Sequence, residues 1–118
     1  MLIGELSRRT GVSPRSLRYY EQHGLLRSSR TANGWRDYDE TAEHRARTVA
    51  EMLAAGLTIE GVKELGPCLD QPDLDACDDP TVALATYRAR LAVVEQRMAA
   101  LQRHRDELAR RVEALAAR

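Results

Sequence analysis

The C-terminal third of the chain constrains the fold more than any other part of the sequence. Residues 81–118 contain no glycine and no proline, the two residue types that most strongly interrupt a helix. Apolar side chains recur there at steps of three and four residues, with one gap: Leu84, Tyr87, Leu91, Val94, Met98, Leu101, Leu108, Val112 and Leu115. This heptad pattern predicts one long helix with an apolar seam, which is typical of a coiled coil.

A single helix of this kind cannot shield its own seam. At about 1.5 Å per residue it is roughly 50 Å long, which is too long for the small N-terminal part to cover. The simplest partner is a second copy of the chain in a twofold-symmetric dimer. Arg105 fills the gap in the seam. We interpret it as a packing compromise whose charge extends to water, and a role in fixing the dimer register is the alternative.

Charge is unevenly distributed along the chain, although the net charge is zero. Residues 1–36 contain seven arginines and two acidic residues, whereas residues 60–80 contain one lysine and seven acidic residues. A basic segment of this kind attracts phosphate groups. The chain has no apolar run long enough for a signal peptide or a membrane span. We therefore expect a cytoplasmic protein with no membrane partner.

The N-terminal residues carry signals for two short helices, over residues 3–9 and 14–22. Ser13 is a good N-cap for the second helix, and Pro14 suits the first helical position because its missing N–H is not needed there. Gly24 provides the residue that ends this helix. Two short helices joined by a tight turn predict a helix-turn-helix.

A hairpin and two further helices are expected after the helix-turn-helix. The dipeptide Asn33-Gly34 favours a tight turn, with basic residues around it at Arg27, Arg30 and Arg36. A hairpin in this place is a wing. Capping signals predict helices over residues 41–55 and 59–65, and the acidic stretch from Pro67 to Pro80 is interpreted as a loop.

The expected fold class is therefore mainly α: a winged helix-turn-helix with a small β-hairpin wing, two further helices and a long C-terminal dimerisation helix. We divide the chain into a DNA-binding domain over residues 1–70, an acidic linker over 71–80 and a coiled-coil helix over 81–118.

Two stretches of the sequence resemble the MerR family of bacterial transcription regulators. They are IGELSRRTGVSPRSLRYYEQHGLL, which begins at Ile3, and RTANGWRDY, which begins at Arg30. The resemblance implies a homodimer that binds a pseudo-palindromic operator in double-stranded DNA and distorts the promoter spacer, so that RNA polymerase is affected indirectly. Because the chain stops at Arg118, we expect a small member of the family without a C-terminal effector domain, and we expect no cofactor.

The resemblance also implies which residues face the DNA. They are Arg15, Ser16, Arg18, Tyr19 and Tyr20 of the second helix, and Arg30, Asn33, Gly34, Arg36 and Tyr38 of the wing. The alternative is that the aromatic residues only build a small core, and for Trp35 we expect the core. For Arg18 and Arg36 we expect DNA contact, because a domain this small has no structural need for clustered unpaired arginines. Tyr20 is compatible with either role.

Cys68 and Cys77 leave three interpretations open. They could form a disulfide, bind a soft metal with help from a second subunit, or have no role, with Cys68 buried as a small apolar residue. A thiol- or metal-responsive regulator is therefore one alternative function, and a coiled-coil protein-interaction adaptor is another. We do not expect an enzyme, because the sequence has no recognisable catalytic triad or phosphate-binding loop.

Overall fold

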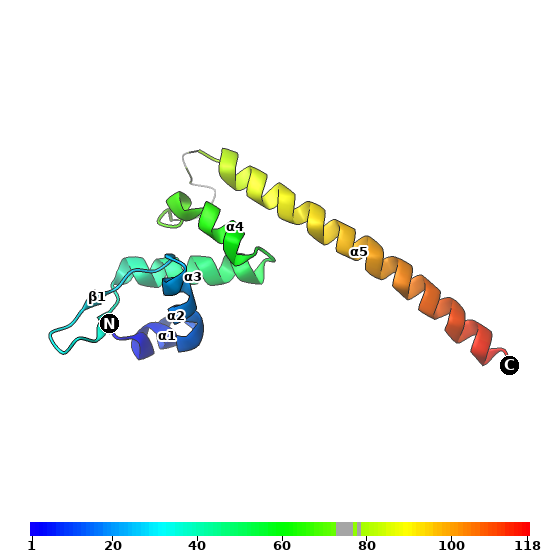
Figure 1. Ribbon diagram of the computed structural model, residues 1–118, viewed down its shortest axis with the longest axis horizontal. Coiled ribbons are helices and arrows are strands. Elements are labelled where there is room, and N and C mark those ends of the chain that lie inside the picture. Colours follow the sequence, from blue (N-terminus) through cyan, green and yellow to red (C-terminus); the bar gives the residue numbers. More distant parts are fainter. Residues whose placement is uncertain (73–76, 78) are drawn as a thin grey trace. The chain divides into compact units, whose positions relative to one another are not determined.

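The structure is a computed structural model that describes residues 1–72, 77 and 79–118. It divides into two units, Met1–Leu84 and Ala85–Arg118, which we describe separately (Figure 1). The first unit contains five helical segments and one hairpin among its described residues, and the second consists of most of the long helix α5.

The first two helices are α1, Ile3–Thr10, and α2, Pro14–Gln22. Their boundaries confirm the predicted helix-turn-helix. Gly11 ends α1 in the left-handed conformation, with φ of 73°, which glycine adopts without steric cost. The Ser13 hydroxyl accepts a hydrogen bond from the Ser16 N–H at 3.1 Å and so caps α2. Gly24 follows α2 with φ of 74°.

The wing is a two-stranded antiparallel hairpin. Strand β1, Ser29–Arg30, pairs with β2, Arg36–Asp37, and Arg30 lies opposite Arg36. Gly34 takes φ of 80° in the loop over residues 31–35 between the strands, a conformation that glycine adopts without steric cost. The hairpin is confirmed but is shorter than its flanking sequence suggested, because Leu25 and Leu26 are buried in the core and do not pair as a strand.

Three helical segments follow the hairpin. They are α3, Glu40–Ala54, α4, Ile59–Glu64, and the short 3-10 helix η1, Gly66–Cys68. The Asp39 carboxylate caps α3 and the Thr58 hydroxyl caps α4. The expected loop from Pro67 onward is wrong in its first residues, because Cys68 and Leu69 are buried in the first unit.

The core of the first unit is almost entirely aliphatic, as expected for a chain without phenylalanine. It is formed mainly where α1 packs on α2 and α3, and where α3 packs on α4. Its largest fully buried side chains are Tyr38, Leu6, Leu17, Leu26, Met52, Leu65, Leu69, Val49 and Val62. Val12 and Leu17 pack inward with Leu6, as the helical spacing predicts.

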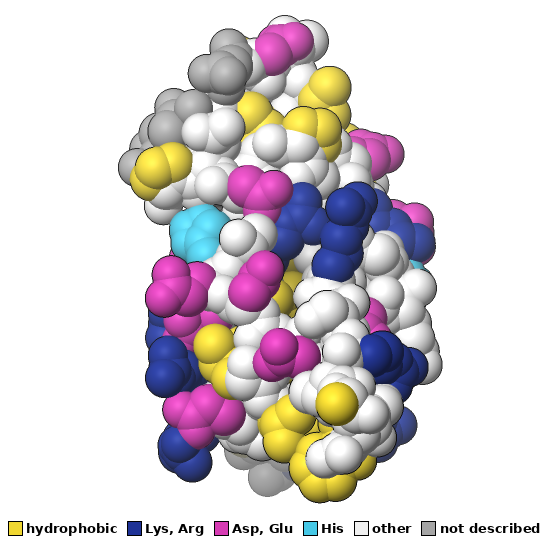
Figure 2. Space-filling view, turned by 90° about the vertical axis from the view of Figure 1, so that its left-hand side faces the viewer, with side chains coloured by type: hydrophobic (Ala, Val, Ile, Leu, Met, Phe, Trp, Pro, Cys, Tyr) yellow, Lys and Arg dark blue, Asp and Glu magenta, His cyan; other side chains and the backbone are white. Residues whose placement is uncertain are grey.

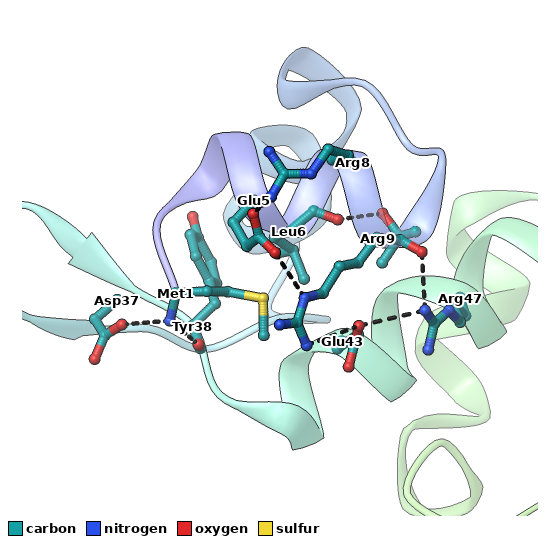
Figure 3. Close-up of polar contacts among 10 residues, drawn as sticks. Met1, Glu5, Leu6, Arg8, Arg9, Asp37, Tyr38, Glu43 and Arg47 are labelled. Carbon is teal, nitrogen blue, oxygen red and sulfur yellow. Dashed lines mark hydrogen bonds and ion pairs between the residues drawn. The ribbon is translucent and has the colours of Figure 1, made fainter.

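Polar contacts join α1, α3 and the hairpin at one side of this core (Figure 3). The Met1 ammonium group donates to Asp37 Oδ1 at 2.7 Å and to the Tyr38 carbonyl at 2.6 Å. The Tyr38 N–H donates back to the Met1 carbonyl at 2.7 Å. Arg47 of α3 donates to the Arg9 carbonyl at 2.8 Å. These contacts fix the second strand and α3 against the start of the helix-turn-helix.

Arg45 of α3 connects three segments. Its guanidinium donates to the Leu25 carbonyl at 3.2 Å, to the Gly66 carbonyl at 3.3 Å and to Asp70 Oδ1 at 2.6 Å. The Arg45 side chain is mostly buried. It therefore gives the Leu25 carbonyl, at the end of the helix-turn-helix, a hydrogen-bond partner. It is a second donor to the Gly66 carbonyl, which also accepts from the Leu69 N–H at 3.2 Å.

Tyr38 is 1% exposed, and its hydroxyl has no hydrogen-bond partner of normal geometry among the described residues. Burial, together with the nearby Glu21 carboxylate, raises the pKa of Tyr38 to about 12. The prediction that Tyr38 faces outward from the wing is wrong, because β2 ends there and the ring turns into the core.

Helix α5 spans Thr81–Ala116, which corresponds to about 54 Å. Most of its seam is open to solvent in the single chain: Leu84, Leu91, Met98, Leu101, Leu108, Val112 and Leu115 are 48% to 66% exposed. Arg105 is also exposed and pairs with Asp106 at 3.2 Å. Among the described residues, no helix is long and apolar enough to cross a membrane.

Arg45→Ala should lower the free energy of unfolding by about 1–3 kcal/mol, because it leaves the carbonyl of the buried Leu25 unpaired and removes the contacts to Gly66 and Asp70. Arg47→Ala is the matched control on the same helix: its side chain is half exposed, and we expect a loss of about 0–1 kcal/mol. Urea denaturation of both variants measures the difference. Equal losses would contradict the connecting role of Arg45.

Ionisation of the Tyr38 hydroxyl makes the free energy of unfolding depend on pH under alkaline conditions. Its pKa is about 12 in the folded chain and about 10 in an unfolded chain, so the folded state holds this proton more tightly. The free energy of unfolding should therefore fall between about pH 10 and pH 12, by an amount on the order of 2 kcal/mol. Tyr38→Phe should remove this part of the pH dependence in urea denaturation, and parallel pH profiles for the two proteins would contradict it.

Candidate nucleic-acid interface

The outer face of α2 carries cations that no acidic group among the described residues neutralises. Arg15 and Arg18 are exposed and have no hydrogen bond or ion pair with any residue that the structure describes. Arg27, between α2 and the hairpin, is also exposed and has no hydrogen bond or ion pair among the described residues. Leu17 lies on the opposite side of α2 and is fully buried, so packing of the helix fixes which side faces solvent.

Polar and aromatic groups accompany these cations on α2. The Ser16 hydroxyl, half-buried, accepts a hydrogen bond from the Ser13 hydroxyl at 3.0 Å. The Tyr19 ring is exposed and meets the His23 ring edge-on, with 4.4 Å between the ring centroids. Tyr20 is buried, which decides between the two roles left open for it: its ring belongs to the core.

The hairpin presents a second group of exposed residues. Arg30 donates to the Gly34 carbonyl at 2.9 Å, which holds its side chain along the loop. Asn33 and Gly34 are exposed, as expected. The expectation for Trp35 is wrong: its side chain is 59% exposed, because the residue follows Gly34 at the tip of the hairpin, away from the core.

Arg36 differs from the other arginines of this face. Its Nε forms an ion pair with Glu21 Oε2 of α2, at 2.7 Å. The expectation that Arg36 is unpaired is therefore wrong. Sequence reasoning missed this contact because the two residues lie fifteen positions apart and meet only through tertiary folding.

The hairpin and the two first helices enclose an open hollow of about 310 Å³. Its lining combines three arginines with apolar side chains: Leu2, Ile3, Arg18, Arg30, Gly34, Trp35 and Arg36. Viewed from the hairpin side, the molecule shows arginine and lysine side chains beside exposed hydrophobic ones, with acidic side chains among them (Figure 2). Cations next to an exposed aromatic ring suit a backbone of sugars and phosphates.

Cys68 and Cys77 are joined in a disulfide, with 5.3 Å between their Cα atoms. This is one of the three arrangements that the sequence left open. Cys68 is buried at the end of η1. Within residues 1–72, 77 and 79–118, no group of three or more His, Cys, Asp or Glu side chains has the geometry of a metal site.

Comparison with known proteins agrees with this geometry. Residues 1–66 match the family described as "MerR HTH family regulatory protein", and residues 44–111 match "MerR, DNA binding". The HTH-type transcriptional regulator HmrR of Rhizobium leguminosarum bv. viciae is 35% identical over 83 residues, which cover 70% of this chain and 64% of HmrR. The HTH-type transcriptional regulator ZntR of Escherichia coli K12 is 30% identical over 109 residues, which cover 92% of this chain and 75% of ZntR.

A solved structure extends the similarity to the fold. The transcription regulator PbrR691 from Ralstonia metallidurans CH34, in complex with lead(II), has a TM-score of 0.75 and 29% identity, covering 92% of this chain and 82% of PbrR691. These relatives are named as transcription regulators, a class of protein that is not enzymatic, which agrees with the expectation from the sequence. This chain belongs to the MerR family of helix-turn-helix regulatory proteins.

Proposed function

We propose that this protein is a sequence-specific DNA-binding transcription regulator that acts as a homodimer. The observation that carries the proposal is the group of exposed cations without acidic partners among the described residues, Arg15, Arg18 and Arg27, on and just after α2. Unneutralised arginines produce a positive potential that attracts the phosphate backbone. Membership of the MerR family supports the same function.

In the proposed complex, the N-terminal part of α2 enters the major groove. This is the usual position of a recognition helix in a helix-turn-helix, and Arg15, Ser16 and Arg18 are then the side chains nearest the base edges. Tyr19 is exposed, and its hydroxyl is a group that can hydrogen-bond a phosphate. The hairpin, with Arg30, Asn33, Gly34 and Arg36, contacts the flanking backbone and groove.

The exposed seam of α5 supports the dimer. A second copy would cover the apolar side chains that a single chain leaves in water, at a gain of about 25 cal/mol for each Å² of apolar surface removed from water. Two copies related by a twofold axis match a pseudo-palindromic operator, with half-sites about one turn of DNA apart or a multiple of it.

We further propose that the dimer distorts the promoter spacer and so changes how RNA polymerase engages the promoter. The resemblance of the whole chain to MerR regulators supports this step. Because the base sequence of the spacer sets how easily the DNA is distorted, the protein would select its operator by this deformability as well as by direct base contacts.

Arg18→Ala should weaken binding to a duplex that the wild-type protein enriches from a randomised library by about 1–3 kcal/mol. Arg88→Ala is the control, because Arg88 is exposed on α5 outside the seam and has no partner among the described residues. Electrophoretic mobility shifts measure both affinities. Unchanged affinity for Arg18→Ala would refute the interface, and absence of DNA binding even at low salt would favour a protein-interaction adaptor.

A second candidate function is a thiol-responsive or metal-responsive form of the same regulator. The observation that favours it is the Cys68–Cys77 pair, together with relatives such as "Heavy metal-dependent transcription regulator 2" of Rhizobium meliloti. When reduced, the pair would supply two thiolate donors, whereas a structural zinc site needs about four ligands. The described residues of one chain therefore do not complete a metal site, and a second copy would have to contribute ligands.

Reduction of the disulfide should lower the free energy of unfolding by about 2–3 kcal/mol, because the bond closes a short loop in the unfolded chain. Denaturation with and without tris(2-carboxyethyl)phosphine measures this effect, and Cys77→Ser should be insensitive to the reductant. The second candidate also predicts different operator affinities for the oxidised, reduced and zinc-treated proteins. Three equal affinities would exclude it.

A further inference from the structure

Glu21 is an unexpected residue on a surface proposed to bind phosphate. Residues 1–36 contain only two acidic residues, Glu5 and Glu21, among seven arginines. Glu5 lies on α1 and pairs with Arg8 and Arg9. Glu21 lies instead on α2, the proposed recognition helix. A carboxylate there repels DNA phosphates, so it needs a reason other than DNA contact.

The contacts of Glu21 connect the recognition helix to the wing. Its Oε2 forms an ion pair with Arg36 Nε of β2, at 2.7 Å. The Glu21 side chain is 20% exposed and that of Arg36 is 43% exposed, so the carboxylate is the more buried partner of the pair. An ion pair with one partner mostly shielded from water is screened less than a pair between two fully exposed groups.

The other carboxylate oxygen points into the unit. Glu21 Oε1 is buried and has no hydrogen-bond partner of normal geometry among the described residues, and the same is true of the Tyr38 hydroxyl. The two side chains are close enough for the Glu21 carboxylate to contribute to the raised pKa of Tyr38. Glu21 is therefore between a buried tyrosine at the end of β2 and an exposed arginine within β2.

We propose that Glu21 is a positioning residue for DNA recognition, which holds Arg36 and the hairpin in a fixed place beside α2. The proposal rests on the DNA-binding function proposed above. A two-stranded hairpin has little stability of its own, and these strands have two residues each. Anchoring the hairpin before DNA binding reduces the conformational entropy that the hairpin loses when it contacts the DNA backbone. The arginines of α2 remain free for the DNA, whereas Arg36 is oriented by its partner.

Glu21→Ala distinguishes this role from simple charge repulsion. If Glu21 only repels phosphate, its removal strengthens DNA binding; if it positions Arg36, its removal weakens binding, by about tenfold. Glu21→Gln keeps the size of the side chain and an oxygen beside Arg36 but removes the charge, and it should bind DNA more tightly than Glu21→Ala. Glu5→Ala removes the same charge without contact to the hairpin and should leave binding equal or slightly stronger. In an Arg36→Ala background, Glu21→Ala should cause no further weakening.

A second measurement tests the same role without DNA. Trp35 is the only tryptophan in the chain and lies at the exposed hairpin tip, so its time-resolved fluorescence anisotropy reports hairpin motion. Glu21→Ala should increase the amplitude of fast motion, and Glu5→Ala should not. Circular dichroism melting of each variant shows that the unit is still folded.

The outcomes separate the two proposals. If the wild-type protein binds no DNA, the proposed function fails, and the anisotropy still decides whether Glu21 orders the hairpin. If the wild type binds DNA but Glu21→Ala binds as tightly or more tightly, or if the anisotropy is unchanged, the positioning role is overturned.

Discussion

An apolar stripe along a solvated helix is the physical constraint on which the rest of the molecule depends. Helix α5 leaves leucine, valine and methionine side chains exposed along its seam. Leaving that much apolar surface in water is unfavourable, and another helix with the same spacing relieves it. If the partner is a second copy of the chain, one helix determines both the oligomeric state and the number of recognition helices. A single helix-turn-helix of this size offers few contacts, so pairing two of them is what makes specific binding attainable.

The cations of the first unit are organised in two ways. Arg15 and Arg18 on α2 have no partners among the described residues, so their charge is fully available to a phosphate backbone. Arg36 is engaged by Glu21, and Arg30 by the carbonyl of its own loop. The helix thus supplies free charge on a rigid, packed element, whereas the hairpin supplies charge held in place by an ion pair and a hydrogen bond. Both arrangements reduce the disorder that DNA binding would otherwise have to remove.

The sequence predicts the parts of this fold that depend on local chemistry. The Ser13 and Thr58 caps and the left-handed Gly34 each act within a few residues of their own position, so helix ends and the hairpin turn could be read from spacing alone. Trp35 and Tyr38 were assigned to the wrong environments because both are aromatic and lie in the same short strand region. Which ring turns inward depends on how β2 meets the core, a tertiary property that no local pattern encodes.

The oligomeric state of the unmodified chain tests the central claim most directly. Sedimentation equilibrium at micromolar concentration, in the absence of DNA, gives the mass in solution without any assumption about the operator. A dimer paired through α5 predicts a mass of two chains over this range. A stable monomer would mean that the seam remains open to water, and it would contradict the proposed arrangement of two recognition helices on one operator.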